Sequence, residues 1–301
     1  MVTLKMALQI LHGIPAAQHE KDDSIRALAH EINQQWMASK GDYDPTRPPH
    51  WAFRSQRQLI GPLNQVFEDW DESDSVTNPM NFLLPGYETL WRIVLRCFLE
   101  LNFRGHSDAP HWQAVLKSFA DQPTPTQLDS ASADASGVCA RDIVQEALRL
   151  YPPTRRIYRD YIDELDRTVS VAADVEGMHR DESVWQDDAC LFNPDRWNRK
   201  PIYDGSKQSE QTRLTDFAEA HFMSFGRQPF RCPARRRFPV NGDKSGKSGF
   251  WLPFGLTMIS MLTAALTDEI GEKWRLNASL PETAPLDTGR EAYEELMLER
   301  C

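Results

Sequence analysis

The first stretch whose residue types could do chemistry is HFMSFGRQPFRCPARRRF, residues 221–238, which surrounds Cys232 with phenylalanine and arginine. An isolated cysteine is most often a small buried apolar residue. A cysteine thiolate is also a nucleophile and a soft ligand for a transition metal. The stretch alone leaves both interpretations open, so the other polar stretches must decide between them.

A second stretch, EALRLYPPTRR, places Glu146 and Arg149 three residues apart on a predicted helix, where they are neighbours on one face. Apolar residues surround the pair, which indicates at least partial burial. Downstream, FNPDRW (192–197) forms a predicted turn whose Arg196 could complete a three-membered network with the carboxylate. The alternative is a surface ion pair of little energetic consequence.

A third stretch, PGYETL at 85–90, puts the acid Glu88 beside the hydroxyl of Thr89. Pro85 and Gly86 should interrupt the hydrogen-bond ladder of a long apolar helix. An acid next to an alcohol can relay protons. The simplest alternative is a hydrogen bond from Thr89 to a carbonyl one turn back.

The elements that must position these residues are predicted mostly from apolar spacing and from turn-rich composition. The expected helices are 22–40, 55–68, 81–104, 140–150 and 253–266, the last with Pro253 at its first position. Short strands are expected at 168–176, and exposed loops at 121–137 and 239–249.

The bulk composition narrows the class of protein. With 301 residues, 41% hydrophobic and 26% charged, the sequence is ordinary for a globular protein. A net charge of -10 argues against a nucleic-acid binder, because phosphate neutralisation needs a basic face. The five cysteines follow no zinc or disulfide pattern, which favours a reducing compartment. The sequence contains no run of about 20 apolar residues that could span a membrane.

Taken in order, these stretches resemble the C-terminal half of the cytochrome P-450 family of haem-thiolate monooxygenases, and its fungal members most. PGYET resembles the oxygen-activating groove of the family's central helix, and EALR resembles its Glu-x-x-Arg helix. FNPDRW resembles the Pro-x-Arg meander, and FGRQPFRCPA resembles the haem-ligand loop. Each motif alone is weak, but four in the family's order and rough spacing are hard to obtain by chance.

The resemblance implies a mainly α fold with small β-sheets, which is an N-terminally truncated cytochrome P-450-like fold in a single domain spanning 1–301. The implied segments are leading helices at 1–78, the central oxygen-groove helix at 79–104, the Glu-x-x-Arg helix, meander and haem-ligand loop at 139–238, an insertion at 239–252, and the final helix with C-terminal strands at 253–301.

The resemblance also implies which residues bind the cofactor, haem b. Cys232 would be the axial ligand of the haem iron, because a thiolate donates the electron density that favours O–O cleavage. Phe225 would shield this thiolate. Arg231, Arg227 and Arg159 would pair with the haem propionates.

The remaining site residues would deliver protons or hold the scaffold. Thr89 would donate a hydrogen bond to dioxygen, and Glu88 would supply the acid function. Glu146, Arg149 and Arg196 would form a structural network that fixes the geometry beneath the haem.

Two departures from the family pattern keep two functions open. Gln228 and Phe230 stand where the family has glycine and arginine, and the family's early elements have no counterpart. The first function is a haem-thiolate monooxygenase that inserts one oxygen atom from O2 into an apolar small molecule, in secondary metabolism or lipid oxidation. The alternative is a catalytically inactive P-450-like binding or interaction protein.

The expected partners are an NADPH-dependent flavoprotein reductase and an apolar small-molecule substrate, with no nucleic acid. The family suggests an intracellular protein at the endoplasmic reticulum surface, although this chain carries no membrane anchor. Without the early elements, part of the central helix should be exposed and drive self-association. The apolar residues of that surface are Leu84, Leu90, Trp91, Val94, Leu95, Phe98 and Leu99.

Overall fold

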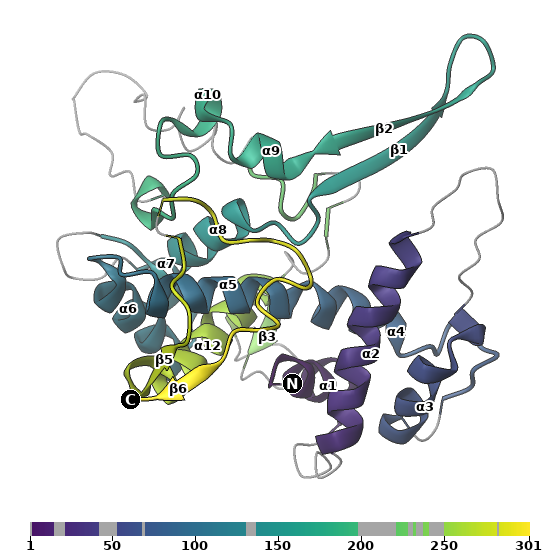
Figure 1. Cartoon of the computed structure of the whole chain (residues 1–301), viewed down its shortest axis with the longest axis horizontal. Helices are drawn as coiled ribbons and strands as arrows, with labels where there is room; N and C mark the ends of the chain where they lie inside the picture. The colour runs from purple at the N-terminus through teal and green to yellow at the C-terminus, as the bar shows by residue number, and fades with distance from the viewer. Residues whose placement is uncertain are drawn as a thin grey trace. The chain divides into compact units, whose positions relative to one another are not determined.

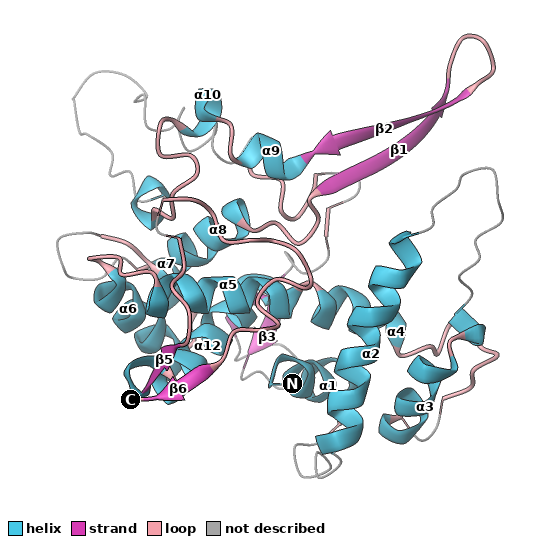
Figure 2. Cartoon of the chain, viewed as in Figure 1, coloured by secondary structure: helices cyan, strands magenta, loops and turns pink. Residues whose placement is uncertain are grey.

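The computed structural model of the chain describes residues 2–14, 22–41, 53–67, 70–130, 137–197, 221–227, 231–232, 237–240, 250–281 and 283–301. These residues are mostly helical, and their strands form three two-stranded antiparallel sheets (Figures 1 and 2). The predicted fold class is therefore confirmed. The chain divides into two compact units, unit 1 (Met1–Arg92 with Gly289–Glu291) and unit 2 (Ile93–Thr288 with Ala292–Cys301). The single domain expected from the sequence stays a prediction.

Unit 1 is built from helices that share one apolar core. Its elements are α1 (Val2–His12), α2 (Asp22–Gly41), η2 (Phe53–Ser55), α3 (Arg57–Val66), α4 (Met80–Leu83) and η3 (Leu84–Glu88). Leu8 of α1, Leu28 of α2, Leu63 of α3 and Leu83 of α4 are fully buried in this core. The helices predicted at 22–40 and 55–68 are confirmed as α2 and α3, since apolar residues at helical spacing point into the core.

The predicted break in the long apolar helix is present, and it is a π-helical turn. The segment consists of α4, the π-turn η3, and α5 (Leu90–Phe103). Pro85 in this turn has no N–H to donate, so the regular ladder cannot continue through it. Single π-turns within helices are frequent at functional sites.

The apolar surface that was expected to be exposed on this helix is covered, so that expectation is wrong. Leu90, Val94, Phe98 and Leu99 are buried, and Leu84, Trp91 and Leu95 are half-buried. Packing within the chain therefore shields these side chains from water.

Unit 2 surrounds α8 with helices and carries the sheets. Its elements beyond α5 are α6 (Ala109–Asp121), α7 (Pro125–Asp129), α8 (Ala140–Leu150), β1 (Arg156–Ile162), β2 (Thr168–Asp174), α9 (Val175–His179), α10 (Glu182–Trp185), η4 (Pro194–Trp197), β3 (Arg237–Val240), β4 (Phe250–Pro253), α12 (Phe254–Glu269), η6 (Gly271–Lys273), β5 (Trp274–Leu276) and β6 (Leu298–Arg300). Helix α8 packs against α6, α7, α12 and η4, and α6 packs against α12.

Several boundaries in unit 2 differ from the sequence-based expectations. The loop predicted at 121–137 contains the short helix α7, because Thr124 accepts a hydrogen bond from the Gln127 N–H and Pro125 fits the first helical position. Pro253 ends β4, and α12 begins at Phe254. The insertion predicted at 239–249 lies mostly outside the described residues, which resume at Phe250.

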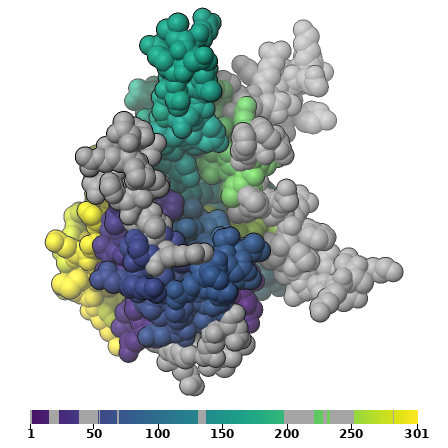
Figure 3. Space-filling view, turned by 90° about the vertical axis from the view of Figure 1, so that its right-hand side faces the viewer, coloured from purple at the N-terminus to yellow at the C-terminus, as the bar shows by residue number. Residues whose placement is uncertain are grey.

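The strand predicted at 168–176 is β2, which ends at Asp174, and its partner β1 was not predicted. The two strands pair antiparallel from Arg156↔Asp174 to Ile162↔Thr168. Their hairpin extends away from α8 and α9 (Figures 1 and 3). Most residues of β1 are exposed, so β1 lacks the buried–exposed alternation that identifies strands in a sequence.

Candidate active site

Helix α8 supplies the two central charged residues of the site. Asp142 caps its first turn, with the Cys139 N–H donating to Asp142 Oδ2 at 2.9 Å. The chain leaves the helix at Tyr151, just before Pro152. Glu146 and Arg149 are both 0% exposed, so the pair is not the surface contact that the sequence left open.

Arg149 holds Glu146 in a two-pronged contact. Its Nε donates to Glu146 Oε2 at 2.9 Å and its Nη2 donates to Oε1 at 2.8 Å. The remaining nitrogen, Nη1, donates to the carbonyl oxygens of His179 and Ala189 at 2.5 and 2.6 Å. Arg149 therefore connects α8 to the meander (residues 179–197) as well as to the carboxylate.

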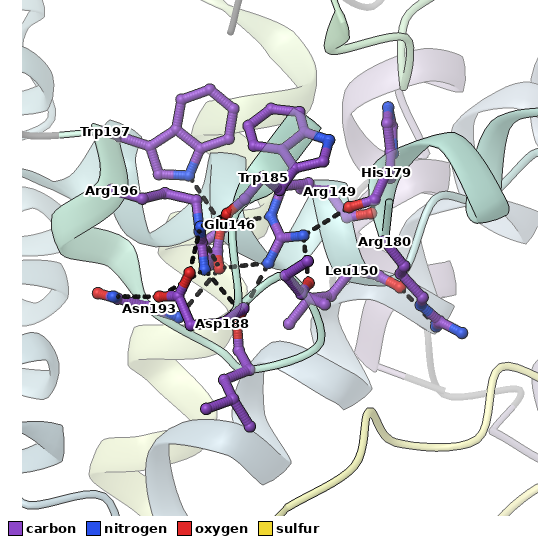
Figure 4. Close-up of polar contacts among 12 residues, drawn as sticks. Glu146, Arg149, Leu150, His179, Arg180, Trp185, Asp188, Asn193, Arg196 and Trp197 are labelled. Carbon is purple, nitrogen blue, oxygen red and sulfur yellow. Dashed lines mark hydrogen bonds and ion pairs between the residues drawn. The ribbon is translucent and has the colours of Figure 1, made fainter. Parts of the chain in front are cut away.

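Three further donors reach the same carboxylate from the meander. Arg196 Nε and the Asn193 N–H each lie 2.9 Å from Glu146 Oε1, and Trp197 Nε1 lies 2.9 Å from Oε2. Figure 4 shows the carboxylate between the guanidinium groups of Arg149 and Arg196. Burial alone would raise the pKa of Glu146, but the two arginines outweigh it and the pKa is lowered.

These contacts fix the positions of the side chains around the Glu146 carboxylate. Glu146 is an ionised acceptor with a donor on every side, and Asp188 provides Arg196 with a second carboxylate at 3.0 Å. Such fully paired buried charges add little net stability, yet removing one partner is costly. The structure thus brings Glu146, Arg149 and Arg196 together, and their role in the protein stays a prediction.

His179, which the sequence reading did not single out, joins this network to the cysteine stretch. It is 0% exposed, its Nδ1 lies 3.0 Å from the Arg149 carbonyl oxygen, and its Nε2 accepts the Met223 N–H at 2.9 Å. Its ring stacks on Phe222 with the ring centroids 5.8 Å apart. Burial lowers the pKa of His179 to about 4, so the ring is neutral at pH 7. The local sequence carries no signal for His179 beyond its position between the EALR and FNPDRW stretches.

The cysteine stretch is tied to α8 and closed on itself by backbone hydrogen bonds. Ser224 Oγ donates to the Leu148 carbonyl oxygen at 2.7 Å. The Gly226 N–H donates to the Met223 carbonyl oxygen at 2.8 Å, and Gly226 has a φ of 64°, which favours glycine. The Cys232 N–H donates to the Phe225 carbonyl oxygen at 2.7 Å. Cys232 is thus held beside the buried Phe225.

Cys232 has the chemistry that an axial haem ligand needs. It is a free thiol and half-buried. Burial raises the pKa values of the Cys97 and Cys139 thiols to about 12, so neither is a thiolate near neutral pH. Cys190 and Cys301 are free as well, but Cys190 lies in the meander, between two residues whose carbonyl oxygens accept from Arg149, and Cys301 is exposed. The donor set therefore fits a haem iron at Cys232.

The arginines predicted to pair with haem propionates are exposed to solvent. Arg227 and Arg231 flank the cysteine loop. Arg159 lies on β1, where its Nη1 donates to the Tyr158 carbonyl oxygen at 2.8 Å. The departures from the family pattern at Gln228 and Phe230 lie outside the described residues.

The predicted proton-relay residues lie in unit 1. The Thr89 hydroxyl donates to the Pro85 carbonyl oxygen at 2.8 Å, one turn back. Glu88 is 2% exposed, accepts a hydrogen bond from Trp91 Nε1 at 3.3 Å, and forms an ion pair with Arg290. The guanidinium of Arg290 also lies 5.0 Å from the centre of the Trp36 ring. Glu88, Thr89 and Arg290 all belong to unit 1, whereas the cysteine loop belongs to unit 2.

The open face of the π-turn is occupied by α1. A Cβ added at Gly86 would overlap the side chain of Leu11. A break in the helix at Pro85 and Gly86 could leave room for a small molecule, but the Leu11 side chain fills the space beside Gly86. A bound small molecule at this face therefore requires Leu11 to move.

The described residues contain no group of three or more His, Cys, Asp or Glu residues placed to hold a metal ion. Within the same residues, no helix has both the length and the apolarity to cross a bilayer.

Comparisons with known proteins agree on one family, although no family model matches the chain. The chain is 25% identical to cytochrome P-450 CYP749A22 of Panax ginseng, over 58% of this chain and 33% of that protein. It is 27% identical to cytochrome P-450 monooxygenase claQ of Ampulloclitocybe clavipes, over 51% and 32%. It is 30% identical to the cytokinin hydroxylase of Arabidopsis thaliana, over 50% and 27%. The matched segments span about a third of the length of these curated relatives or less.

A solved structure supports the same fold. The haem domain of a cytochrome P-450 mutant aligns with a TM-score of 0.50 at 17% identity, covering 100% of this chain and 64% of that chain. At this identity the likeness shows the fold alone. The relatives come from plants, a worm and a fungus, so a specifically fungal character stays a prediction.

Proposed function

We propose, from the similarity of about half of the chain to cytochrome P-450 proteins, that it belongs to that family and acts as a haem-thiolate monooxygenase. The proposed reaction inserts one oxygen atom from O2 into an apolar small molecule, in lipid oxidation or secondary metabolism. The observation that carries the proposal is the continuous connection from the Glu146 network through His179 and Ser224 to the loop that holds Cys232.

The cysteine loop is the proposed cofactor site. Haem b bound there supplies oxygen activation, which protein side chains cannot perform alone. The Cys232 thiolate would hold the iron, and Phe225 would keep water away from the sulfur. Arg227, Arg231 and Arg159 would offer guanidinium groups to the propionates. Since Arg159 lies on β1, the hairpin would share in binding one edge of the cofactor.

The Glu146 network would keep this loop in place during turnover. Arg149 fixes the carbonyl oxygens of His179 and Ala189, and His179 in turn fixes the Met223 N–H. Movement of α8 would therefore shift the loop at its base. We assign these residues a positioning role, because none of them belongs to the cysteine loop itself.

Glu88 and Thr89 would handle protons. Glu88 is buried and paired with Arg290, so it would release or accept a proton only when Arg290 moves away. Thr89 has to turn its hydroxyl from the Pro85 carbonyl oxygen in order to donate elsewhere. Both residues would thus act after a rearrangement of the π-turn.

Electrons would come from an NADPH-dependent flavoprotein reductase. The family suggests that the protein works at the endoplasmic reticulum surface. The substrate is proposed to be apolar because the family's substrate space is lined mostly by apolar side chains.

A second candidate function, a binding protein of the same fold without redox activity, is favoured by one observation. In unit 1, Leu11 covers Gly86 and Arg290 neutralises Glu88. A family member that no longer activates oxygen could have the same contact between Leu11 and Gly86 and the same ion pair between Glu88 and Arg290.

One assay distinguishes the two candidate functions. The chain is loaded with haemin and mixed with a flavoprotein reductase, NADPH, dodecanoic acid and isotopically heavy O2, and the products are analysed by mass spectrometry. The monooxygenase proposal expects a hydroxylated product carrying one heavy oxygen atom. A haem-loaded chain that neither oxidises NADPH nor gives such a product on any of a panel of apolar substrates would favour the binding protein.

A further inference from the structure

Unit 2 contains a pocket that the proposed function does not use. Its volume is about 370 Å³, which is within the range of small-molecule sites. It lies between the turn before α6 and the meander, and it shares Asp188 and Asn193 with the Glu146 network. The lining residues are His106, Ser107, Asp108, Trp112, Asp188, Leu191, Phe192, Asn193 and Asp195.

One wall of the pocket is aromatic. The rings of His106, Trp112 and Phe192 are in mutual contact, with centroids 5.5 to 5.9 Å apart. His106 is fixed in this arrangement by Glu100, whose Oε2 lies 2.7 Å from His106 Nε2. Aromatic faces attract cations through their electron-rich rings.

The opposite side is acidic, with Asp108, Asp188 and Asp195, and two of these carboxylates have a basic neighbour, Arg196 for Asp188 and His111 for Asp195. Asp188 is committed to Arg196 and Asn193 (Figure 4). Asp108 accepts only the Ser107 hydroxyl at 3.3 Å. The pKa of Asp195 is raised by burial and by the charge of Asp108, while His111 lowers it. A positive ligand would relieve this repulsion.

A buried donor on the wall provides a separate indication of a ligand. Trp112 is 3% exposed, and its indole N–H has no hydrogen-bond acceptor among the described residues. Buried indole N–H groups usually have a partner. An oxygen atom carried by a bound molecule would supply one.

From these features we infer that the pocket binds a small organic cation that carries an oxygen acceptor, an amino alcohol in chemical class. The ammonium group lies against the aromatic wall with Asp108 and Asp195 as its counter-charges, and the oxygen accepts from Trp112. A metal ion fits less well, because the described residues contain no metal-ligand cluster. The site does not depend on haem, so it stands apart from the proposed function.

The test uses choline as the probe and 3,3-dimethylbutan-1-ol, its neutral equivalent of the same shape, as the control ligand. Calorimetric titration of the full chain is expected to show choline binding about tenfold more tightly than the neutral alcohol. Tetramethylammonium, which lacks the oxygen, should bind more weakly than choline. Equal affinity for choline and the neutral alcohol, or no detectable choline binding, would overturn the inference.

A pair of variants checks the location. Asp108→Asn with Asp195→Asn should weaken choline binding about tenfold. The matched control, Asp160→Asn with Asp166→Asn on the β1–β2 hairpin, removes the same charge far from the pocket in sequence and should leave binding unchanged. Circular dichroism confirms that both double variants fold. If the two double variants bind choline equally, the cation is held by general charge attraction and the pocket assignment is wrong.

Discussion

At the scale of single residues, Arg149 is the side chain on which most contacts of the site depend. The Arg149 side chain is fully buried. It forms an ion pair with Glu146 and donates hydrogen bonds to the carbonyl oxygens of His179 and Ala189. Arg149→Ala leaves the carboxylate without its main partner and should lower the free energy of unfolding by about 3–5 kcal/mol. Urea denaturation followed by circular dichroism measures this loss.

The lysine variant and a surface control sharpen that prediction. Arg149→Lys keeps the charge but cannot form the two-pronged contact, so it should recover only part of the loss. Arg167→Ala removes an arginine from an exposed ion pair with Asp163 and should leave stability nearly unchanged. An Arg149→Ala protein as stable as the Arg167→Ala protein would show that the network contributes nothing.

The burial of His179 leads to a prediction, also at the residue scale, about how the free energy of unfolding depends on pH. Its pKa is lowered by burial from 6.5 to about 4, so the unfolded chain binds more protons between these pH values. The resulting stability is complete above pH 6.5 and is lost as the pH falls towards 4, by about 3 kcal/mol in total. His179→Gln, which keeps a donor and an acceptor, should flatten this part of the stability profile.

The control for His179 is His30→Gln, since His30 is exposed on α2. Unfolding free energies measured at several pH values from 7 down to 4 should superimpose for the His30→Gln and parent proteins. A His179→Gln profile as steep as that of the parent would mean that other groups carry the pH dependence.

At the scale of elements, helix α1 places the Leu11 side chain in the space beside Gly86 of the π-turn η3. A Cβ on Gly86 would overlap Leu11, whereas Leu11→Ala removes the obstacle. In a double-mutant cycle, Gly86→Ala should therefore be more costly alone than in the Leu11→Ala background, with a coupling of about 1 kcal/mol. Both residues belong to unit 1, so the cycle reports on one compact unit.

Additive effects in this cycle would contradict the packing of Leu11 over Gly86.

The elements also show how far the sequence could predict the site. EALR and FNPDRW could be read as one network because their residue types and order suggest a partner for the carboxylate, and the structure places Glu146 and Arg196 2.9 Å apart. The ion pair of Arg290 with Glu88 joins residues far apart in the chain, and no local pattern encodes such a contact. The same holds for Leu11, whose contact with Gly86 depends on how α1 packs.

The hairpin illustrates a different limit. Strand β1, RIYRDYI, mixes charged and aromatic residues and is exposed along most of its length. Period-2 patterning arises when one face is buried, so a hairpin that extends into solvent carries little of it. The helices expected at 22–40, 55–68, 81–104 and 140–150, by contrast, were predictable because their apolar residues point into a core. Helix α6 (Ala109–Asp121) was not predicted.

At the scale of the whole molecule, the proposed function depends on Cys232 holding haem as a thiolate. This is measured by the absorption spectrum of the haemin-loaded chain after reduction and exposure to carbon monoxide. The parent chain should show the long-wavelength Soret band that marks a thiolate ligand, and this band should be lost in Cys232→Ala and kept in the matched control Cys190→Ala. The band's absence from the parent chain, or its survival in Cys232→Ala, would contradict the claim.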